Sequence, residues 1–77
     1  MILMKQFHWV RDNIVIDFPI PKFLQNTLTE AEELDLNNSP EYHCVAENID
    51  ILAKNLYTGR VITKEQWDLL CEKYPFE

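Results

Sequence analysis

Along residues 40–58 the apolar side chains recur at steps of three and four, which is the spacing of one buried stripe on an α-helix. Ser39 suits the N-cap, and Pro40 suits the first turn because its missing N–H would be unpaired there. Gly59 suits a left-handed stop after the last turn. A helix over 40–58 is therefore predicted, with its stripe formed by Tyr42, Val45, Ala46, Ile49, Leu52, Ala53 and Leu56.

Two further helices are predicted beside this one. Thr63 and Gln66 have the spacing of a capping box, in which each side chain bonds to the other's backbone N–H, and they begin a helix over 63–74. Pro21 presets the first turn of another amphipathic stretch, which predicts a helix over 21–36. The short connections favour antiparallel or steeply crossed neighbours.

The first 18 residues fit this pattern less well. Residues 14–18 are β-branched and aromatic, which favours a strand. Residues 3–10 fit both alternation and helical spacing, so periodicity does not decide between strand and helix there. Residues 11–13 suit a turn, and we expect a short N-terminal β-hairpin or strand within residues 1–18. The predicted fold class is mainly α, a three-helix domain with a small β piece (α+β).

With 77 residues the chain is well below the size at which chains divide into domains, so we expect one domain over residues 1–77. A core this small rarely supplies more than about 3–5 kcal/mol of net stability, and pairing with a second copy or a partner would add to it. No stretch reaches the roughly 18 apolar residues that span a bilayer, so we expect no membrane association. We expect a cytoplasmic protein whose two cysteines are reduced.

The charges are unevenly distributed along the chain. The formal net charge is −6, and no lysine or arginine occurs between Lys22 and Lys54. Such a field repels phosphate backbones and attracts a basic partner, although acidic residues also serve solubility alone. The acids of this interval are Glu30, Glu32, Glu33, Asp35, Glu41, Glu47 and Asp50.

Sequence patterns of metal and catalytic sites are missing. His8, His43, Cys44 and Cys71 form neither a Cys-x-x-Cys nor a His-x-x-x-His unit. A single glycine excludes a glycine-rich phosphate loop, and no nucleophile and base share a spacing signature. We therefore assign no catalytic, cofactor or metal residue, and expect a protein that is not an enzyme.

The aromatic residues indicate a binding surface. A small core does not readily hide two Trp, three Tyr and four Phe, and aromatic side chains are frequent interface anchors. Both chain ends could instead fold over the core and bury theirs. We expect a non-enzymatic protein–protein interaction or regulatory module whose partner is a basic protein or a second copy in a homodimer. The predicted partner-binding residues are Phe7, Trp9, Glu30, Glu33, Glu47, Asp50 and Phe76.

A small DNA-binding regulator is the alternative. Residues 39–74 have the outline of a helix-turn-helix, but their second helix carries more carboxylates than lysines. A DNA-reading helix instead presents positive charge to the phosphates, so nucleic-acid binding is less favoured. The alternative requires one carboxylate-free face that gathers Lys54, Arg60, Lys64 and Lys73.

Two stretches are similar to parts of small uncharacterised proteins of Gram-positive bacteria. They are residues 28–35, Leu-Thr-Glu-Ala-Glu-Glu-Leu-Asp, and residues 53–74, which include Glu-Gln-Trp-Asp-Leu-Leu-Cys-Glu-Lys-Tyr. The similar positions are helix caps and core faces. The resemblance implies a bacterial accessory protein and brings no activity, cofactor or site residue with it.

Overall fold

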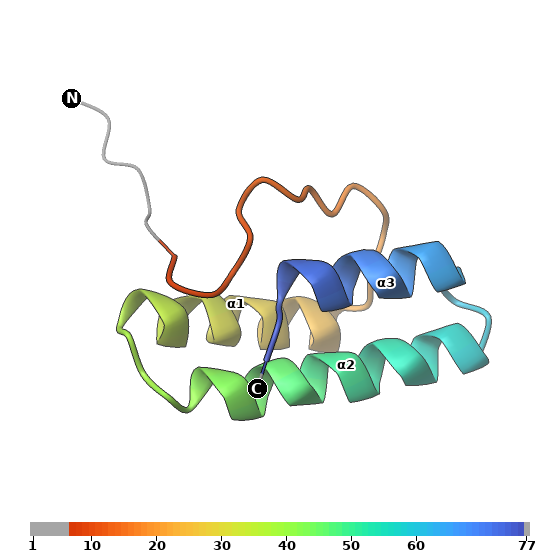
Figure 1. Cartoon of the computed structure of the whole chain (residues 1–77). Coiled ribbons are helices and arrows are strands. Elements are labelled where there is room, and N and C mark those ends of the chain that lie inside the picture. The colour runs from red at the N-terminus through yellow and green to blue at the C-terminus, as the bar shows by residue number, and fades with distance from the viewer. Residues whose placement is uncertain (1–6, 77) are drawn as a thin grey trace.

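The computed structural model of the protein describes residues 7–76, and this part of the chain contains three α-helices. They are α1 over Lys22–Leu36, α2 over Tyr42–Thr58 and α3 over Lys64–Lys73. α2 packs against both α1 and α3, and successive helices run back and forth along the bundle (Figure 1). The mainly helical fold with three helices is confirmed. No helix in residues 7–76 is long and apolar enough to cross a membrane.

The core takes side chains from all three helices. The predicted stripe of α2 is buried at Tyr42, Ala46, Ile49, Ala53 and Leu56. Leu24 of α1 and Leu70 of α3 are both 0% exposed and meet this stripe. Burying one such leucine contributes about 1.5–3 kcal/mol, so the periodic positions hold the three helices together.

The N-terminal segment, residues 7–21, contains no strand, so the predicted β-hairpin is not seen. Residues 3–6 of its first arm lie outside the described residues. The alternation is nevertheless real, because Ile16 and Phe18 pack against the core while Val15 is 70% exposed. Within residues 7–76, no backbone hydrogen bond ties residues 15–19 to a second strand. The alternation of buried and exposed side chains therefore results from burial of one face of an irregular segment and not from pairing in a sheet.

The two predicted N-caps have different outcomes. Thr63 caps α3 in a complete capping box with Gln66, as the spacing predicts. α2 begins at Tyr42, with Glu41 as its N-cap and no side-chain cap. Ser39 lies two positions before this N-cap and accepts a weaker bond from the Glu41 N–H at 3.3 Å.

α2 ends at Thr58 as predicted, but the left-handed residue of its C-terminal turn lies one position later than expected. Gly59 has φ −81°, so the expected left-handed glycine is wrong, and Arg60 takes the left-handed position with φ 63°. The Val61 N–H then donates to the Leu56 carbonyl at 2.8 Å, which completes a Schellman motif. Asn38, with φ 55°, takes the equivalent position after α1.

Candidate functional site

One buried carboxylate fixes the start of the N-terminal segment. Asp35, in the last turn of α1, is 0% exposed. Its oxygens accept the consecutive backbone N–H groups of His8, Trp9 and Val10 at 2.6, 3.0 and 2.7 Å. Hydrogen bonds to a charged acceptor are about twice as strong as neutral ones, and a buried carboxylate needs them to offset its lost hydration. Asp35 therefore places residues 8–10 against the α1–α2 end of the bundle, which we define by the connection 37–41.

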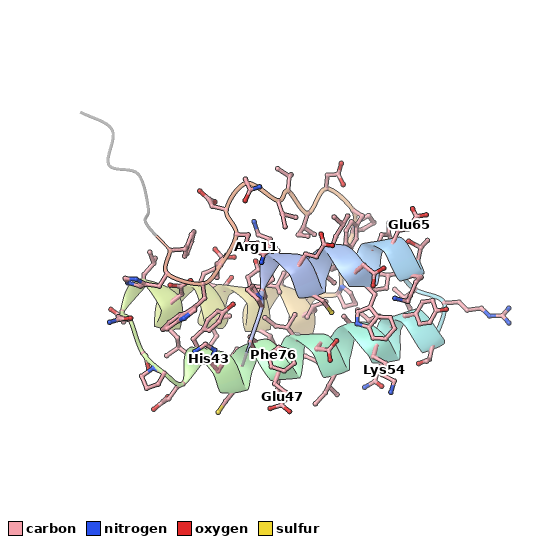
Figure 2. All side chains as sticks on the ribbon, in the orientation of Figure 1. Arg11, His43, Glu47, Lys54, Glu65 and Phe76 are labelled. Carbon is pink, nitrogen blue, oxygen red and sulfur yellow. The ribbon has the colours of Figure 1, made fainter. Side chains whose placement is uncertain are left out.

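Trp9, held in this way, lies against the first turn of α2. Its ring stacks on Tyr42 with centroids 5.0 Å apart, and it meets the edge of His43 at 4.7 Å. A recess of about 120 Å³ is lined by Trp9, His43, Pro75 and Phe76. Figure 2 shows His43 and Phe76 together beside the start of α2. We call this recess the aromatic pocket.

Two buried polar atoms beside Trp9 have no hydrogen-bond partner within residues 7–76, the Tyr42 hydroxyl and Nδ1 of His43. Burial raises the pKa of Tyr42 above its ordinary value, and the negative charge of Asp35 raises it further. The phenol therefore stays neutral. An unpaired buried hydroxyl costs about 1–3 kcal/mol, so the start of α2 is less stable than its apolar packing implies.

The second tryptophan lies at the α2–α3 end, which we define by the connection 59–63. Its indole Nε1–H donates to Asp50 at 3.0 Å, and its ring stacks on Tyr57 with centroids 5.3 Å apart. The ammonium of Lys64 lies 4.8 Å from the ring centroid of Trp67 and pairs with Asp68 at 2.6 Å. This aromatic group already holds a cation from the chain itself.

Cys71 has the properties of a structural thiol. Its Sγ lies 3.0 Å from the Asp50 carboxylate. Burial, followed by the hydrogen bond and the negative charge of Asp50, raises the pKa of Cys71 to about 12. Because the thiolate is the nucleophile, Cys71 is a poor candidate for covalent catalysis. Both cysteines are free, and Cys44 is exposed. Within residues 7–76 no three His, Cys, Asp or Glu side chains are placed to hold a metal ion.

Two of the three predicted aromatic binding residues meet in the structure. Trp9 and Phe76, which lie near opposite ends of the sequence, line the same pocket. Phe76 is 40% exposed, so a partner can reach it. Phe7 does not line this pocket, and both Phe7 and Trp9 pack against the core. The sequence interpretation missed His43 and Pro75, because neither has a local pattern that marks it as a neighbour of Trp9.

The predicted acidic binding residues fall into two groups, those that are exposed and one that is used within the fold. Glu30, Glu33 and Glu47 are exposed, as is Glu41 in the connection between α1 and α2. Glu30 and Glu33 belong to the second half of α1 and Glu47 to the first half of α2. These halves adjoin, because the two helices are antiparallel neighbours (Figure 1). We call these four residues the acidic end. Asp50 is half-buried and is used within the fold by Trp67 and Cys71.

Most exposed cations lie away from the acidic end. Lys22 begins α1, Lys54 lies near the end of α2 and Arg60 follows that helix, so all three belong to the opposite half of the helix pair. Arg11 is also exposed, and it directly follows Val10, which Asp35 holds at the α1–α2 end. Lys64 is paired with Asp68, and the Lys73 ammonium donates to the Ile14 carbonyl. The carboxylate-free basic face that the DNA-binding alternative requires is therefore not formed by the described residues.

A larger groove of about 510 Å³ separates the N-terminal segment from α1 and α3. Its apolar wall includes Ile16 and Leu28. Two of the charged groups at its edge are engaged within the fold, since Glu32 accepts the Tyr74 hydroxyl at 2.7 Å and Lys73 donates to the segment backbone. The third, Asp12, is exposed and has no salt bridge to another described residue, so one carboxylate remains for a ligand of this groove.

No protein-family model matches the chain, and neither a curated protein nor a solved structure matches it. The similarity to small proteins of Gram-positive bacteria therefore stays a prediction. Any functional conclusion rests on the geometry of the acidic end and the aromatic pocket.

Proposed function

We propose that the protein is a non-enzymatic interaction module that binds a basic protein partner through its acidic end. The observation that carries this proposal is the placement of three exposed carboxylates on the adjoining halves of α1 and α2 and of a fourth in the connection between them. No lysine or arginine occurs in residues 23–53, so none of these helical halves contributes a compensating charge. Figure 2 shows Glu47 directed away from the bundle, with Lys54 farther along the same helix.

The expected interaction is strongly salt-dependent. Exposed ion pairs each contribute about 0.2–1 kcal/mol, and salt screens them over about 10 Å at 0.1 M. Four such groups act mainly by steering a basic surface into place and by excluding acidic competitors. Glu32, Asp35 and Asp50 are not part of this surface, because their oxygens accept hydrogen bonds within the fold.

The partner we propose is a different protein, not a second copy. Two acidic ends placed face to face would bring like charges together, which opposes association. A basic partner meets no such repulsion. The bacterial origin and cytoplasmic location expected from the sequence are compatible with this role and belong to the same proposal.

The test is binding of a labelled peptide rich in lysine and arginine, followed by fluorescence anisotropy between about 0.05 and 0.5 M salt. The variant combines neutral substitutions at the acidic end, Glu30→Gln, Glu33→Gln, Glu41→Gln and Glu47→Gln. The control has the same change in net charge at other exposed acids, Asp12→Asn, Asp17→Asn, Glu65→Gln and Glu72→Gln.

We expect the acidic-end variant to bind about tenfold more weakly at low salt, and the control less than about threefold. The wild-type affinity should fall steeply with salt. Equal weakening in the two variants would show that only net charge matters. Absence of salt-dependent binding by the wild type would overturn the proposal.

A further inference from the structure

We infer that the aromatic pocket receives an arginine side chain of the basic partner, with its guanidinium stacked on the ring of Trp9 or Phe76. This inference rests on the proposed function, since it names the group by which the partner would be anchored. The pocket lies beside the acidic end: His43 forms part of its wall, and Glu47 follows four residues later on α2.

The size and lining of the pocket suit a flat cation. A closed apolar cavity of about 150 Å³ holds a benzene ring, and a guanidinium is a smaller planar group, so an open recess of about 120 Å³ accommodates it. Arginine carries such a group, which is weakly hydrated and stacks on aromatic faces. Lysine presents a compact and strongly hydrated charge, which fits a narrow aromatic recess less well.

The placement of Glu47 supplies the charge complementarity. Residues four apart on a helix lie on the same face, so the Glu47 carboxylate is one turn from the imidazole of His43. Figure 2 shows His43, Phe76 and Glu47 along the same stretch of α2. Glu47 is exposed and has no salt bridge to another described residue. A guanidinium in the pocket therefore meets aromatic rings and a nearby free carboxylate.

The α2–α3 end provides an internal comparison. There the face of Trp67 is covered by the ammonium of Lys64, beside the carboxylate of Asp68. The aromatic pocket repeats the ring and the carboxylate, but no lysine or arginine of the described residues lines it. Within residues 7–76 the cation–π contacts involve Trp67 and Tyr74, and none involves Trp9 or Phe76. The missing component is the one that a basic partner brings.

The test compares three peptides that differ at one position, which is arginine, citrulline or lysine. Citrulline keeps the planar shape and removes the charge.

The protein variants test the ring of Phe76. Phe76→Ala and Phe76→Leu both remove the exposed ring, but Leu retains apolar volume. A loss of the preference for arginine in both variants therefore identifies the ring face itself. Phe23→Ala is the matched control, because Phe23 is 52% exposed and lies in the first turn of α1, away from the pocket. Circular dichroism checks that each variant is folded.

We expect the arginine peptide to bind about three- to tenfold more tightly than the citrulline and lysine peptides. Both Phe76 variants should remove that preference, and Phe23→Ala should keep it. In the wild type, titration with acetyl-arginine-amide should shift the indole N–H resonance of Trp9 but not that of Trp67. Equal binding of the three peptides, or an unchanged preference in Phe76→Ala, would overturn the inference.

The two proposals fail in different ways. If neutralising the acidic end weakens peptide binding while the Phe76 variants do not, the interaction module stands and the arginine pocket is wrong. If acetyl-arginine-amide still shifts Trp9 while the acidic-end variant binds the basic peptide normally, the pocket stands and the acidic end is not the docking surface.

Discussion

The two ends of the helical bundle each place a tryptophan beside a carboxylate, but the carboxylate binds a different part of the tryptophan at each end. At the α1–α2 end, Asp35 accepts the backbone N–H of Trp9, so the ring is left to stack on its neighbours and line a pocket. At the α2–α3 end, Asp50 accepts the ring N–H of Trp67, and Lys64 covers the ring face. Both rings are half-buried, but Trp9 lines a recess that Phe76 shares, whereas Trp67 carries a cation from the chain itself.

The difference also concerns how far apart the interacting residues lie in the sequence. Lys64 and Trp67 are neighbours on one helix face, three residues apart. Asp35 instead bonds to backbone groups 25 to 27 residues away. The α2–α3 end joins this local pair to the Asp50 bonds, which span 17 and 21 residues between two packed helices. At the α1–α2 end, the long-range bonds of Asp35 hold a segment outside any helix, and the Arg11 N–H bond to the Lys73 carbonyl supports them. The candidate binding site lies at the end that this segment completes.

The largest test of this comparison is the pair Asp35→Ala and Asp50→Ala. Asp35→Ala removes three charge-assisted hydrogen bonds and leaves backbone donors unpaired, which we expect to cost about 3–5 kcal/mol. That is as much as a core of this size supplies, so the variant should be largely unfolded. Asp50→Ala removes a bond to one indole and a weak bond to one thiol, and should cost about 1 kcal/mol.

Urea unfolding followed by circular dichroism measures both effects. Asp35→Asn is the conservative control, because its amide keeps an acceptor but turns a donor toward the backbone N–H groups, so it should recover less than half of the loss. The proposed contrast between the two ends is wrong if Asp35→Ala and Asp50→Ala lower the free energy of unfolding equally.

The helices were predictable from the sequence because the forces that define them act within four residues. The capping box of Thr63 and the apolar stripe of α2 are local patterns, and both occur in the structure. The irregular structure of residues 14–18 was not predictable in this way. Alternation shows that one face of a segment is buried, but it does not identify a second strand with which the segment would pair. Only the tertiary fold shows that this segment is held by a helix carboxylate instead of a second strand.

The site was predictable only in part, for the same reason. Trp9 and Phe76 attracted attention because they are aromatic and near the termini, but their meeting around His43 depends on long-range packing. Asp35 did leave a signal: it continues the buried stripe of α1 at the spacing of Leu28 and Ala31. A carboxylate on an apolar stripe needs a buried donor, and that requirement could have identified it as an anchor.

A smaller change in the free energy of unfolding is expected when two buried tyrosines near the α1–α2 end are replaced and compared. The Tyr74 hydroxyl donates to Glu32 at 2.7 Å, whereas the Tyr42 hydroxyl has no partner within residues 7–76. Tyr74→Phe should lower the free energy of unfolding by about 1–2 kcal/mol, and Tyr42→Phe should leave it unchanged or raise it by up to about 1 kcal/mol. Urea unfolding at neutral pH measures both. A loss in Tyr42→Phe as large as in Tyr74→Phe would show that its hydroxyl has a partner in solution.

The same tyrosine variants carry a prediction for alkaline pH. Burial, and then the hydrogen bond to Glu32, raise the pKa of Tyr74 above its ordinary 10.0, so the folded state keeps a proton that the unfolded state releases. The resulting stability is present below about pH 10 and is lost as the pH rises further. Tyr74→Phe should therefore unfold with a weaker dependence on pH above this value. An unchanged alkaline slope would contradict the cause given for the raised pKa.

The smallest expected effect compares the turns that close the two ends. Arg60 and Asn38 both occupy left-handed positions, with φ 63° and 55°. An arginine there is strained, since its Cβ crowds the backbone, while asparagine tolerates the conformation. Glycine relieves this strain but also adds entropy to the unfolded chain. Arg60→Gly should therefore raise the free energy of unfolding by about 0.5–1 kcal/mol, and Asn38→Gly, which has less strain to relieve, should raise it by less.

Arg60→Ala removes the charged side chain but keeps the strained φ, so it should give no gain. If Arg60→Ala stabilises the protein as much as Arg60→Gly does, the cause is the arginine side chain and not the left-handed backbone.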